Sequence, residues 1–269
     1  MSAFVPCKLT VRKETVAGPR TLVYDLELSP NVVSSWSLWN VNIGISQIIE
    51  SQRIICFSYR WIGEKKTGFR SEWDHGYSEM ISHLHKLFDE ADVVCGYNSV
   101  GFDDKHSRAA FLTEGLNPPS PFKQLDLYQQ VKKQFNFPSK KLDYVCTRLG
   151  LGGKTKHTGQ ELWNEVLRPT TEESGRKARR LMEKYCKNDV DLTIALYDAL
   201  YPWLAVPINA GLFVENEDEP VCPSCGSADV QSRGFAYTRD ARYRRFYCTV
   251  CPRWARGKRC DKNTELRPV

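Results

Sequence analysis

Two acids lie two residues apart inside an otherwise apolar segment near the start of the chain. Asp25 and Glu27 belong to residues 21–28, and the sequence TLVYDLEL is typical of a buried β-strand. Side chains at i and i+2 of a strand point to the same face, so the two carboxylates would lie side by side. Burying paired like charges is costly unless a cation lies between them, and a divalent metal is the usual solution. The alternative is an edge strand with two solvated acids.

Two further acids occur in patterns that place them on defined elements. Asp103 follows a short apolar strand, in the segment 98–103 (NSVGFD), and Asp189 stands four residues after Tyr185 in YCKND. Residues four apart share one face of a helix, so Tyr185 and Asp189 would point the same way. Together with the pair on segment 21–28, four carboxylates suit two divalent cations about 4 Å apart, as in phosphodiester hydrolysis. Oxygen ligands favour Mg²⁺ or Mn²⁺.

These motifs resemble those of the DEDD 3′→5′ exonucleases, which have the ribonuclease H-like fold and include the proofreading domains of family B DNA polymerases. The Asp-x-Glu strand, the Asn-x-x-x-Phe-Asp segment and the Tyr-x-x-x-Asp helix stand in the family's order, and the likeness covers residues 20–205. Tyrosine at position 185 marks the tyrosine subtype, in which this side chain orients the attacking water. The resemblance implies that Asp25 bridges both metals, that Glu27 and Asp189 hold one, and that Asp103 completes the other.

Other residues are expected to contact the substrate of such a site. Lys154, Lys156 and His157 lie in a glycine-containing loop just before the last helices, which suits phosphate contact, although a solvated basic loop is an equal alternative. Asn98 and Phe102 would shape the substrate groove, unless Phe102 is a core residue. The acids Asp104 and Asp191 are interpreted as helix caps or surface charges, because each stands next to a better-placed acid.

A different metal site is predicted near the end of the chain. Two Cys-x-x-Cys pairs, Cys222 with Cys225 and Cys248 with Cys251, can each offer two thiolates to one tetrahedral Zn²⁺. The pattern resembles a zinc ribbon, which has little core and takes most of its folding energy from the metal. Cys260 is a weaker candidate ligand. The remaining thiols are expected to be packing residues: Cys7, Cys56, Cys95, Cys146 and Cys186.

Basic and aromatic residues surround these cysteines. Residues 220–269 hold eleven Lys or Arg and four Asp or Glu, a net charge of +7 in a chain whose total is +6. Arginine interleaved with aromatic side chains suits contact with a nucleic acid backbone and stacking on bases. We therefore expect Arg244, Arg245 and Trp254 to bind nucleic acid. An arginine-rich surface for docking a protein is the alternative.

The order of apolar segments indicates an α/β fold with a mixed β-sheet flanked by helices. The sequence favours a nuclease domain over residues 1–215, an acidic linker at 216–220 and the ribbon over 220–269. Residues 40–49 are expected to form a strand or a short helix. The remaining strands are expected at 21–28, 53–61, 92–97 and 122–128, and the helices at 77–90, 103–115, 140–149, 160–167 and 176–200.

Composition limits the other possibilities. Hydrophobic residues make up 41% and charged residues 26%, as in ordinary globular proteins, and no apolar run is long enough to span a membrane. The first dozen residues lack the apolar core of a signal peptide, so we expect an intracellular, cytoplasmic protein associated with nucleic acid. The main expectation is an exonuclease acting on DNA ends, with a polymerase or another replication or repair protein as a possible partner. The alternatives are an RNA exonuclease, a structure-selective nuclease and a non-catalytic nucleic-acid-binding accessory.

Overall fold

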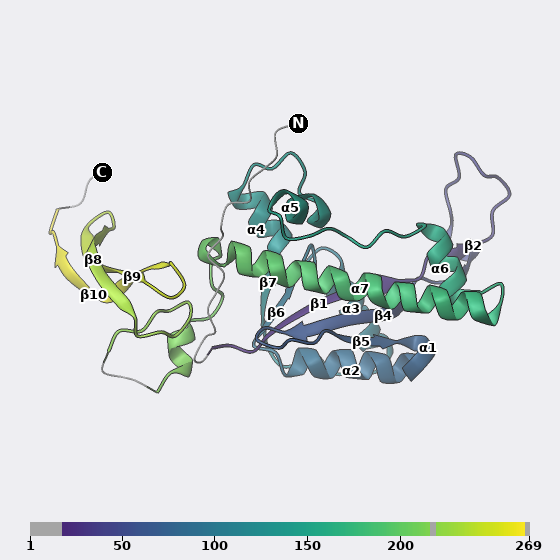
Figure 1. The fold of residues 1–269 in the computed structure, drawn as a ribbon, viewed down its shortest axis with the longest axis horizontal. Coiled ribbons are helices and arrows are strands. Elements are labelled where there is room, and N and C mark those ends of the chain that lie inside the picture. Colours follow the sequence, from purple (N-terminus) through teal and green to yellow (C-terminus); the bar gives the residue numbers. More distant parts are fainter. Residues whose placement is uncertain (1–17, 216–218, 267–269) are drawn as a thin grey trace. The chain divides into compact units, whose positions relative to one another are not determined.

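The structure, a computed structural model, describes residues 18–215 and 219–266. A five-stranded sheet with the order β5-β4-β1-β6-β7 forms the centre of the first compact unit, Thr21–Ala195 (Figure 1). β1 pairs antiparallel with β4 and parallel with β6, so the predicted mixed α/β sheet is confirmed. The strands of this sheet are β1 Thr21–Leu28, β4 Ile54–Trp61, β5 Gly68–Ser71, β6 Val93–Gly96 and β7 Lys123–Asp126.

Alternation along β1 places its two acids on the face opposite Tyr24 and Leu26. Tyr24 and Leu26 belong to a core that includes residues of helices α2 and α3. Asp25 and Glu27 therefore point to the opposite face, where Ile55 of β4 packs against helices α6 and α7. The helices of this unit are α1 Glu72–His75, α2 Tyr77–Asp89, α3 Asp103–Thr113, α4 Leu127–Gln134, α5 Leu142–Arg148, α6 Gln160–Leu167 and α7 Glu172–Leu200.

The segment after β1 differs from its prediction. Instead of one element over residues 40–49, the chain forms a two-stranded sheet of β2 (Val32–Val33) and β3 (Ile48–Glu50), with the short 3₁₀ helix η1 (Ile45–Gln47) before β3. The residues between the two strands are largely exposed, and Trp36 and Trp39 are among them. The apolar residues that suggested a buried element therefore lie on the surface.

The second compact unit contains the described residues from Leu196 onward. An antiparallel sheet of three strands has the order β10-β9-β8 (Figure 1). Before it, the chain forms η2 (Tyr201–Trp203) and η3 (Ala210–Phe213). The strands are β8 Val230–Tyr237, β9 Ala241–Cys248 and β10 Trp254–Asn263.

Side-chain hydrogen bonds within this unit join the segment that follows α7 to the loops that carry the cysteines. The Tyr201 hydroxyl donates to the carbonyl of Ser224, and the Arg253 guanidinium donates to the carbonyls of Tyr201 and Leu204. The predicted domain boundary between 215 and 220 stays a prediction, and residues 216–218 of the predicted linker lie outside the described residues, as does Cys7. No helix in the described ranges is both long enough and apolar enough to cross a lipid bilayer.

Candidate active site and metal centres

β1 brings Asp25 and Glu27 to one face of the central sheet. Carboxylate oxygens of both residues and the Sγ of Cys186 all lie within 4.8 Å of one another. Glu27 is buried, and Asp25 is partly buried. The thiol of Cys186 donates to the carbonyl of Asp25, at 3.7 Å, so helix α7 packs directly beside the acidic part of β1.

Asp103 reaches the same strand from the start of α3. Its Oδ1 accepts a hydrogen bond from the backbone N–H of Leu26, at 3.2 Å, and Leu26 stands between the other two acids. This N–H is available because the pairing of β1 with β6 ends at Val23 and Cys95. The segment that follows β6 thus places its acid against β1, 77 residues away in the sequence.

Asp189, on helix α7, acts electrostatically on both acids of β1, and its own carboxylate is paired with a lysine. The Lys154 amine forms an ion pair with Oδ2 of Asp189 and lies 3.5 Å from the Tyr185 hydroxyl. Oδ1 of Asp189 is buried and accepts no hydrogen bond from the residues that the structure describes. A buried carboxylate oxygen without a donor is costly, and a cation at this position would satisfy it.

Burial and mutual repulsion disturb the acids of this cluster. Loss of water raises the pKa of Glu27 to about 8 and that of Asp103 to about 7. The pKa of Asp25 is also raised, first by burial and then by the charges of Asp103, Glu27 and Asp189. Lys154 lowers the pKa of Asp25 and of Glu27, but burial and the neighbouring acids outweigh it. Four oxygen-bearing acids with an incompletely balanced charge fit hard divalent cations such as Mg²⁺ or Mn²⁺.

Tyr185 is held next to these acids by aromatic neighbours. Its ring meets the rings of His157 and Trp163 edge to face, with centroid separations of 4.7 and 6.1 Å. Trp163 is itself fixed, because its Nε1 donates to the carbonyl of Leu28 at the end of β1. Burial and the surrounding carboxylates raise the pKa of Tyr185. The hydroxyl therefore keeps its proton and can donate a hydrogen bond.

A pocket of about 600 Å³ opens beside Asp25. Sequence reasoning anticipated only three of its lining residues, Asp25, Asn98 and Lys154. Lys140 and Lys141, in the loop before α5, also line the pocket and give it a positively charged wall. The two consecutive lysines were the sequence signal for this wall, and sequence reasoning missed them. The other lining residues are Tyr97, Tyr128, Leu142 and Asp143.

Asp126 orders the loop that carries Asn98, a role that was not expected from the sequence. Its carboxylate accepts hydrogen bonds from the backbone N–H groups of Asn98, at 2.9 Å, and Val100, at 3.3 Å. The same carboxylate caps α4 through the N–H of Tyr128. Asn98 has φ of +66°, a left-handed conformation that asparagine tolerates better than most residues. An acid between a strand and a helix was the signal available for this cap.

The remaining predicted substrate-binding residues of this unit are exposed to solvent to different extents. Phe102 is 42% exposed and contacts the ring of His106, so the alternative of a core residue is wrong. Lys156 is exposed, whereas His157 packs on Tyr185 although much of its surface is accessible. Asp104 is buried and accepts a hydrogen bond from Tyr24 at 2.6 Å, so the interpretation as a cap or surface charge is wrong for this acid.

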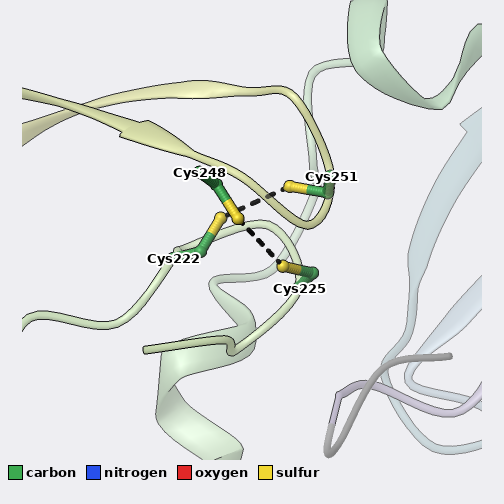
Figure 2. A group of neighbouring side chains, drawn as sticks. All are labelled: Cys222, Cys225, Cys248 and Cys251. Carbon is green, nitrogen blue, oxygen red and sulfur yellow. Dashed lines mark hydrogen bonds between the residues drawn. The ribbon is translucent and has the colours of Figure 1, made fainter. Parts of the chain in front are cut away.

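Four cysteines of the second unit converge on one point. Their sulfur atoms all lie within 4.8 Å of one another, and Figure 2 shows them facing a common centre. The Sγ atoms of Cys222 and Cys251 are 3.5 Å apart, and those of Cys225 and Cys248 are 3.6 Å apart. Zinc bound to four thiolates at about 2.3 Å holds its sulfurs roughly 3.8 Å apart, so the arrangement fits zinc.

Local backbone geometry explains why the first cysteine pair can form half of such a site. Gly226 has φ of +74°, and its N–H donates to the carbonyl of Cys222 in a tight turn. The N–H of Ser224 points at the Cys222 sulfur, at 3.4 Å. Hydrogen bonds from the thiols of Cys225 and Cys251 lower the pKa of Cys222 below its ordinary value. Cys260 is exposed and lies outside the four-cysteine group.

The predicted nucleic-acid-binding residues of this unit lie on neighbouring strands. Arg244 and Arg245 are consecutive in β9, and Trp254 begins β10. The Arg245 guanidinium stands 4.5 Å from the centre of the Trp254 ring. Arg244 is paired in register with Phe235 of β8.

Comparison with known proteins supports the fold. The chain resembles the family B DNA polymerase of the hyperthermophilic archaeon Pyrobaculum calidifontis with a TM-score of 0.53 and 18% identity. The likeness covers 69% of this chain but 25% of the polymerase chain, so this protein spans about a quarter of that length. None of the curated proteins compared with the chain matches it. A family model described as the RNase H superfamily matches residues 48–201, more than half of the sequence, and the chain therefore belongs to the RNase H superfamily.

Proposed function

We propose that this protein is a metal-dependent 3′→5′ exonuclease that releases nucleoside monophosphates from DNA ends. The observation that carries the proposal is the contact between the Asp103 carboxylate and the N–H of Leu26, because it joins the second motif to the strand of the first. Asp189 is coupled electrostatically to both acids of that strand. Membership of the RNase H superfamily supports nuclease chemistry. The 3′→5′ direction rests on the order of the motifs and their resemblance to the DEDD family.

The four acids Asp25, Glu27, Asp103 and Asp189, here called the motif acids, would hold two Mg²⁺ or Mn²⁺ ions. When bound, such ions activate a water molecule and stabilise the oxygen that leaves the phosphorus. Two observations favour this assignment: Oδ1 of Asp189 is buried without a hydrogen-bond donor, and the pKa values of Asp25 and Glu27 are raised. Both show that the positive charge supplied by the chain is too small to balance these acids. By resemblance, Asp25 would contact both ions.

Tyr185 and Lys154 would act on the reacting groups directly. The protonated Tyr185 hydroxyl, fixed by His157 and Trp163, is placed to orient the attacking water. Lys154 neutralises Asp189 in the arrangement described here. The same lysine lines the adjoining pocket, where its amine would contact a substrate phosphate.

The cysteine group would hold one structural Zn²⁺, with Cys222, Cys225, Cys248 and Cys251 as ligands. A bound zinc would join the two knuckles beside the three-stranded sheet, which has few buried apolar side chains of its own. Arginine and aromatic residues of this sheet, Arg245 and Trp254 among them, would bind nucleic acid. The ribbon would thereby raise the local concentration of substrate for the nuclease.

A labelled-strand assay tests the proposal. A single-stranded DNA of about 30 nucleotides, labelled at its 5′ end, should shorten to a ladder in Mg²⁺ or Mn²⁺, whereas a 3′ label should appear at once as a mononucleotide. Matched RNA and a circular single strand are run in parallel. Faster loss of RNA would favour the RNA exonuclease, cutting of the circle would favour a structure-selective nuclease, and binding without cleavage would favour the non-catalytic accessory.

A further inference from the structure

We propose that one face of the three-stranded sheet β8–β9–β10 is a binding platform for single-stranded nucleic acid, and that the opposite face is not. This inference deepens the proposed function, because it states which residues of the ribbon meet the substrate and which form of substrate they select. It rests on the strand register and on a set of stacked arginine and aromatic side chains.

The register sorts the side chains of β9 onto two faces. Tyr243, Arg245 and Tyr247 alternate along β9 and therefore point to the same side. Tyr247 is paired with Trp254 of β10, and Arg245 is paired with Arg256, which adds both partners to this side. Arg233 of β8 joins them, because its guanidinium lies over the Tyr247 ring at 4.7 Å. We name this surface the Trp254 face; its members are Arg233, Tyr243, Arg245, Tyr247, Trp254 and Arg256.

Each of the three aromatic rings of the Trp254 face has an arginine guanidinium group stacked over it. Arg245 stands over Trp254 at 4.5 Å, and Arg256 stands over Tyr243 at 4.4 Å. The rings of Tyr247 and Trp254 are 5.1 Å apart, which links two of these stacks into one continuous array. Along β9 the array extends from Tyr243 to Tyr247, about 14 Å at 3.4 Å per residue.

The array remains accessible. Arg233, Arg245 and Arg256 are exposed, and Trp254 is 51% exposed. Some N–H groups are used within the sheet, because Arg233 donates to Oε1 of Gln231 and Arg245 donates to the carbonyl of Arg233. The outer face of each stacked guanidinium plane and its remaining N–H groups stay available to other partners. Nucleobases stack on such planes as well as on aromatic rings, and the N–H groups are suited to phosphates.

The opposite face is built differently. Arg242, Arg244 and Phe246 point there, and the Arg242 guanidinium lies over Phe235 at 4.3 Å. Asp261, the one acid in the sequences of the three strands, pairs with Arg242 at 2.6 Å and neutralises part of that face. The Trp254 face thus combines stacked planes with three arginines that no strand acid offsets, which favours a polyanion with accessible bases.

Single strands are favoured over duplex DNA because stacking needs unpaired bases. In a duplex the bases are already stacked on one another, and only phosphates would reach the arginines. The electrostatic part of binding should therefore be common to both forms, and the stacking part should be confined to single strands.

Binding of fluorescent 12-nucleotide strands to the full chain tests this inference. The measurements use an Asp25→Asn background, so that cleavage does not interfere and a failure of the proposed nuclease activity leaves the result readable. Single-stranded DNA, single-stranded RNA and duplex DNA are compared, and the zinc content of each protein is measured to show that the ribbon is intact.

Trp254→Ala and Arg245→Ala should each weaken single-strand binding about tenfold or more. Arg244→Ala, a change of the same residue type one position away on the opposite face, should alter it by less than about twofold. Arg245→Lys should recover little of the loss, because lysine keeps the charge but not the stacking plane. Duplex binding should be weaker than single-strand binding and insensitive to Trp254→Ala.

Several outcomes would overturn the inference. Equal losses for Arg244→Ala and Arg245→Ala, in proteins that retain zinc, would show that the effect of charge does not depend on the face. Full recovery by Arg245→Lys would remove the stacking role. Unchanged single-strand affinity in Trp254→Ala would show that the face serves another purpose. A preference for DNA or RNA would identify which single strand the platform takes.

Discussion

The amine of Lys154 is hydrogen-bonded to Oδ2 of Asp189 and lies 3.5 Å from the hydroxyl of Tyr185. A lysine from the loop before α6 thus contacts both residues of the Tyr-x-x-x-Asp motif on α7. The pair is partly shielded from water, because the Asp189 side chain is almost fully buried and that of Lys154 is 34% exposed. A bound cation and this ammonium group would therefore compete for the same carboxylate.

Replacing Lys154 should strengthen metal binding. In Lys154→Met the competing positive charge is lost, so the affinity for Mn²⁺ in the absence of nucleic acid should rise by about three- to tenfold. Electron paramagnetic resonance of free Mn²⁺ during a titration measures this. Lys156→Met, in the same loop but exposed, is the matched control and should bind Mn²⁺ like the parent protein. Weaker Mn²⁺ binding by Lys154→Met would contradict the competition.

The motif acids make stability depend on pH when no divalent cation is present. The pKa of Glu27 is raised from 4.5 to about 8, and that of Asp103 from 3.8 to about 7, so the folded state holds these protons more tightly than the unfolded state. Their contribution is complete below pH 4 and disappears as the pH rises through 7 and 8. Between pH 5 and pH 9 the free energy of unfolding should fall by about 2–4 kcal/mol.

Urea unfolding followed by circular dichroism at both pH values measures this fall, with the zinc content checked in each sample. Saturating Mn²⁺ should abolish most of the decline, because ions bound at the acids stabilise their charged forms. Glu27→Gln, which cannot ionise, should reduce it. Metal-free protein that becomes more stable on going from pH 5 to pH 9 would be incompatible with the burial described for these acids.

Tyr185→Phe should slow cleavage without changing metal affinity. The variant keeps the ring that packs on His157 and Trp163 and loses only the hydroxyl that would orient the water. We expect kcat to fall by about 10- to 100-fold. Tyr77→Phe, at a partly buried residue that packs against the core on the other side of the sheet, serves as the control and should retain activity. An unchanged kcat in Tyr185→Phe would remove the hydroxyl from the mechanism.

Removing one thiolate should take the zinc and the nucleic acid affinity away together. Cys222→Ser should lower the zinc content from one per chain to nearly none, measured by atomic emission, because four ligands close the site. Binding to single strands should weaken in the same variant, since β8–β10 lose the support of the metal. Cys260→Ser should retain zinc, as this exposed thiol lies outside the group. Zinc retained by Cys222→Ser would refute the site.

Much of the α/β fold could be predicted because its longer elements have clear periodicity. The apolar spacing of Tyr77–Asp89 and the β-forming run Ile54–Trp61 both match the structure to within a residue or two. Short elements were missed: α1 spans four residues, and α4 follows directly from a strand at the Asp126 cap. Elements this short depend on tertiary contacts more than on local pattern.

The candidate site shows the same division. The motif acids were selected from the sequence because the spacing of each motif is local to one element, and their convergence in the fold was inferred from resemblance; their role as metal ligands stays a prediction. The hydrogen bond from Leu26 to Asp103, the ion pair of Lys154 and the cap made by Asp126 depend on contacts between distant segments. The two faces of the ribbon could not be assigned either, because bulges interrupt the register between β9 and its neighbours.

The most direct measurement compares the parent protein with Asp25→Asn, for both Mn²⁺ stoichiometry and cleavage of a 5′-labelled single strand. Asp25 lies where the charges of the other three motif acids meet. The parent should bind two Mn²⁺ ions and shorten the strand from its 3′ end. Asp25→Asn should bind at most one ion at the same concentration and cleave roughly a thousandfold more slowly, while keeping its circular dichroism spectrum. Undiminished cleavage by Asp25→Asn, or a parent that binds no Mn²⁺, would contradict the account.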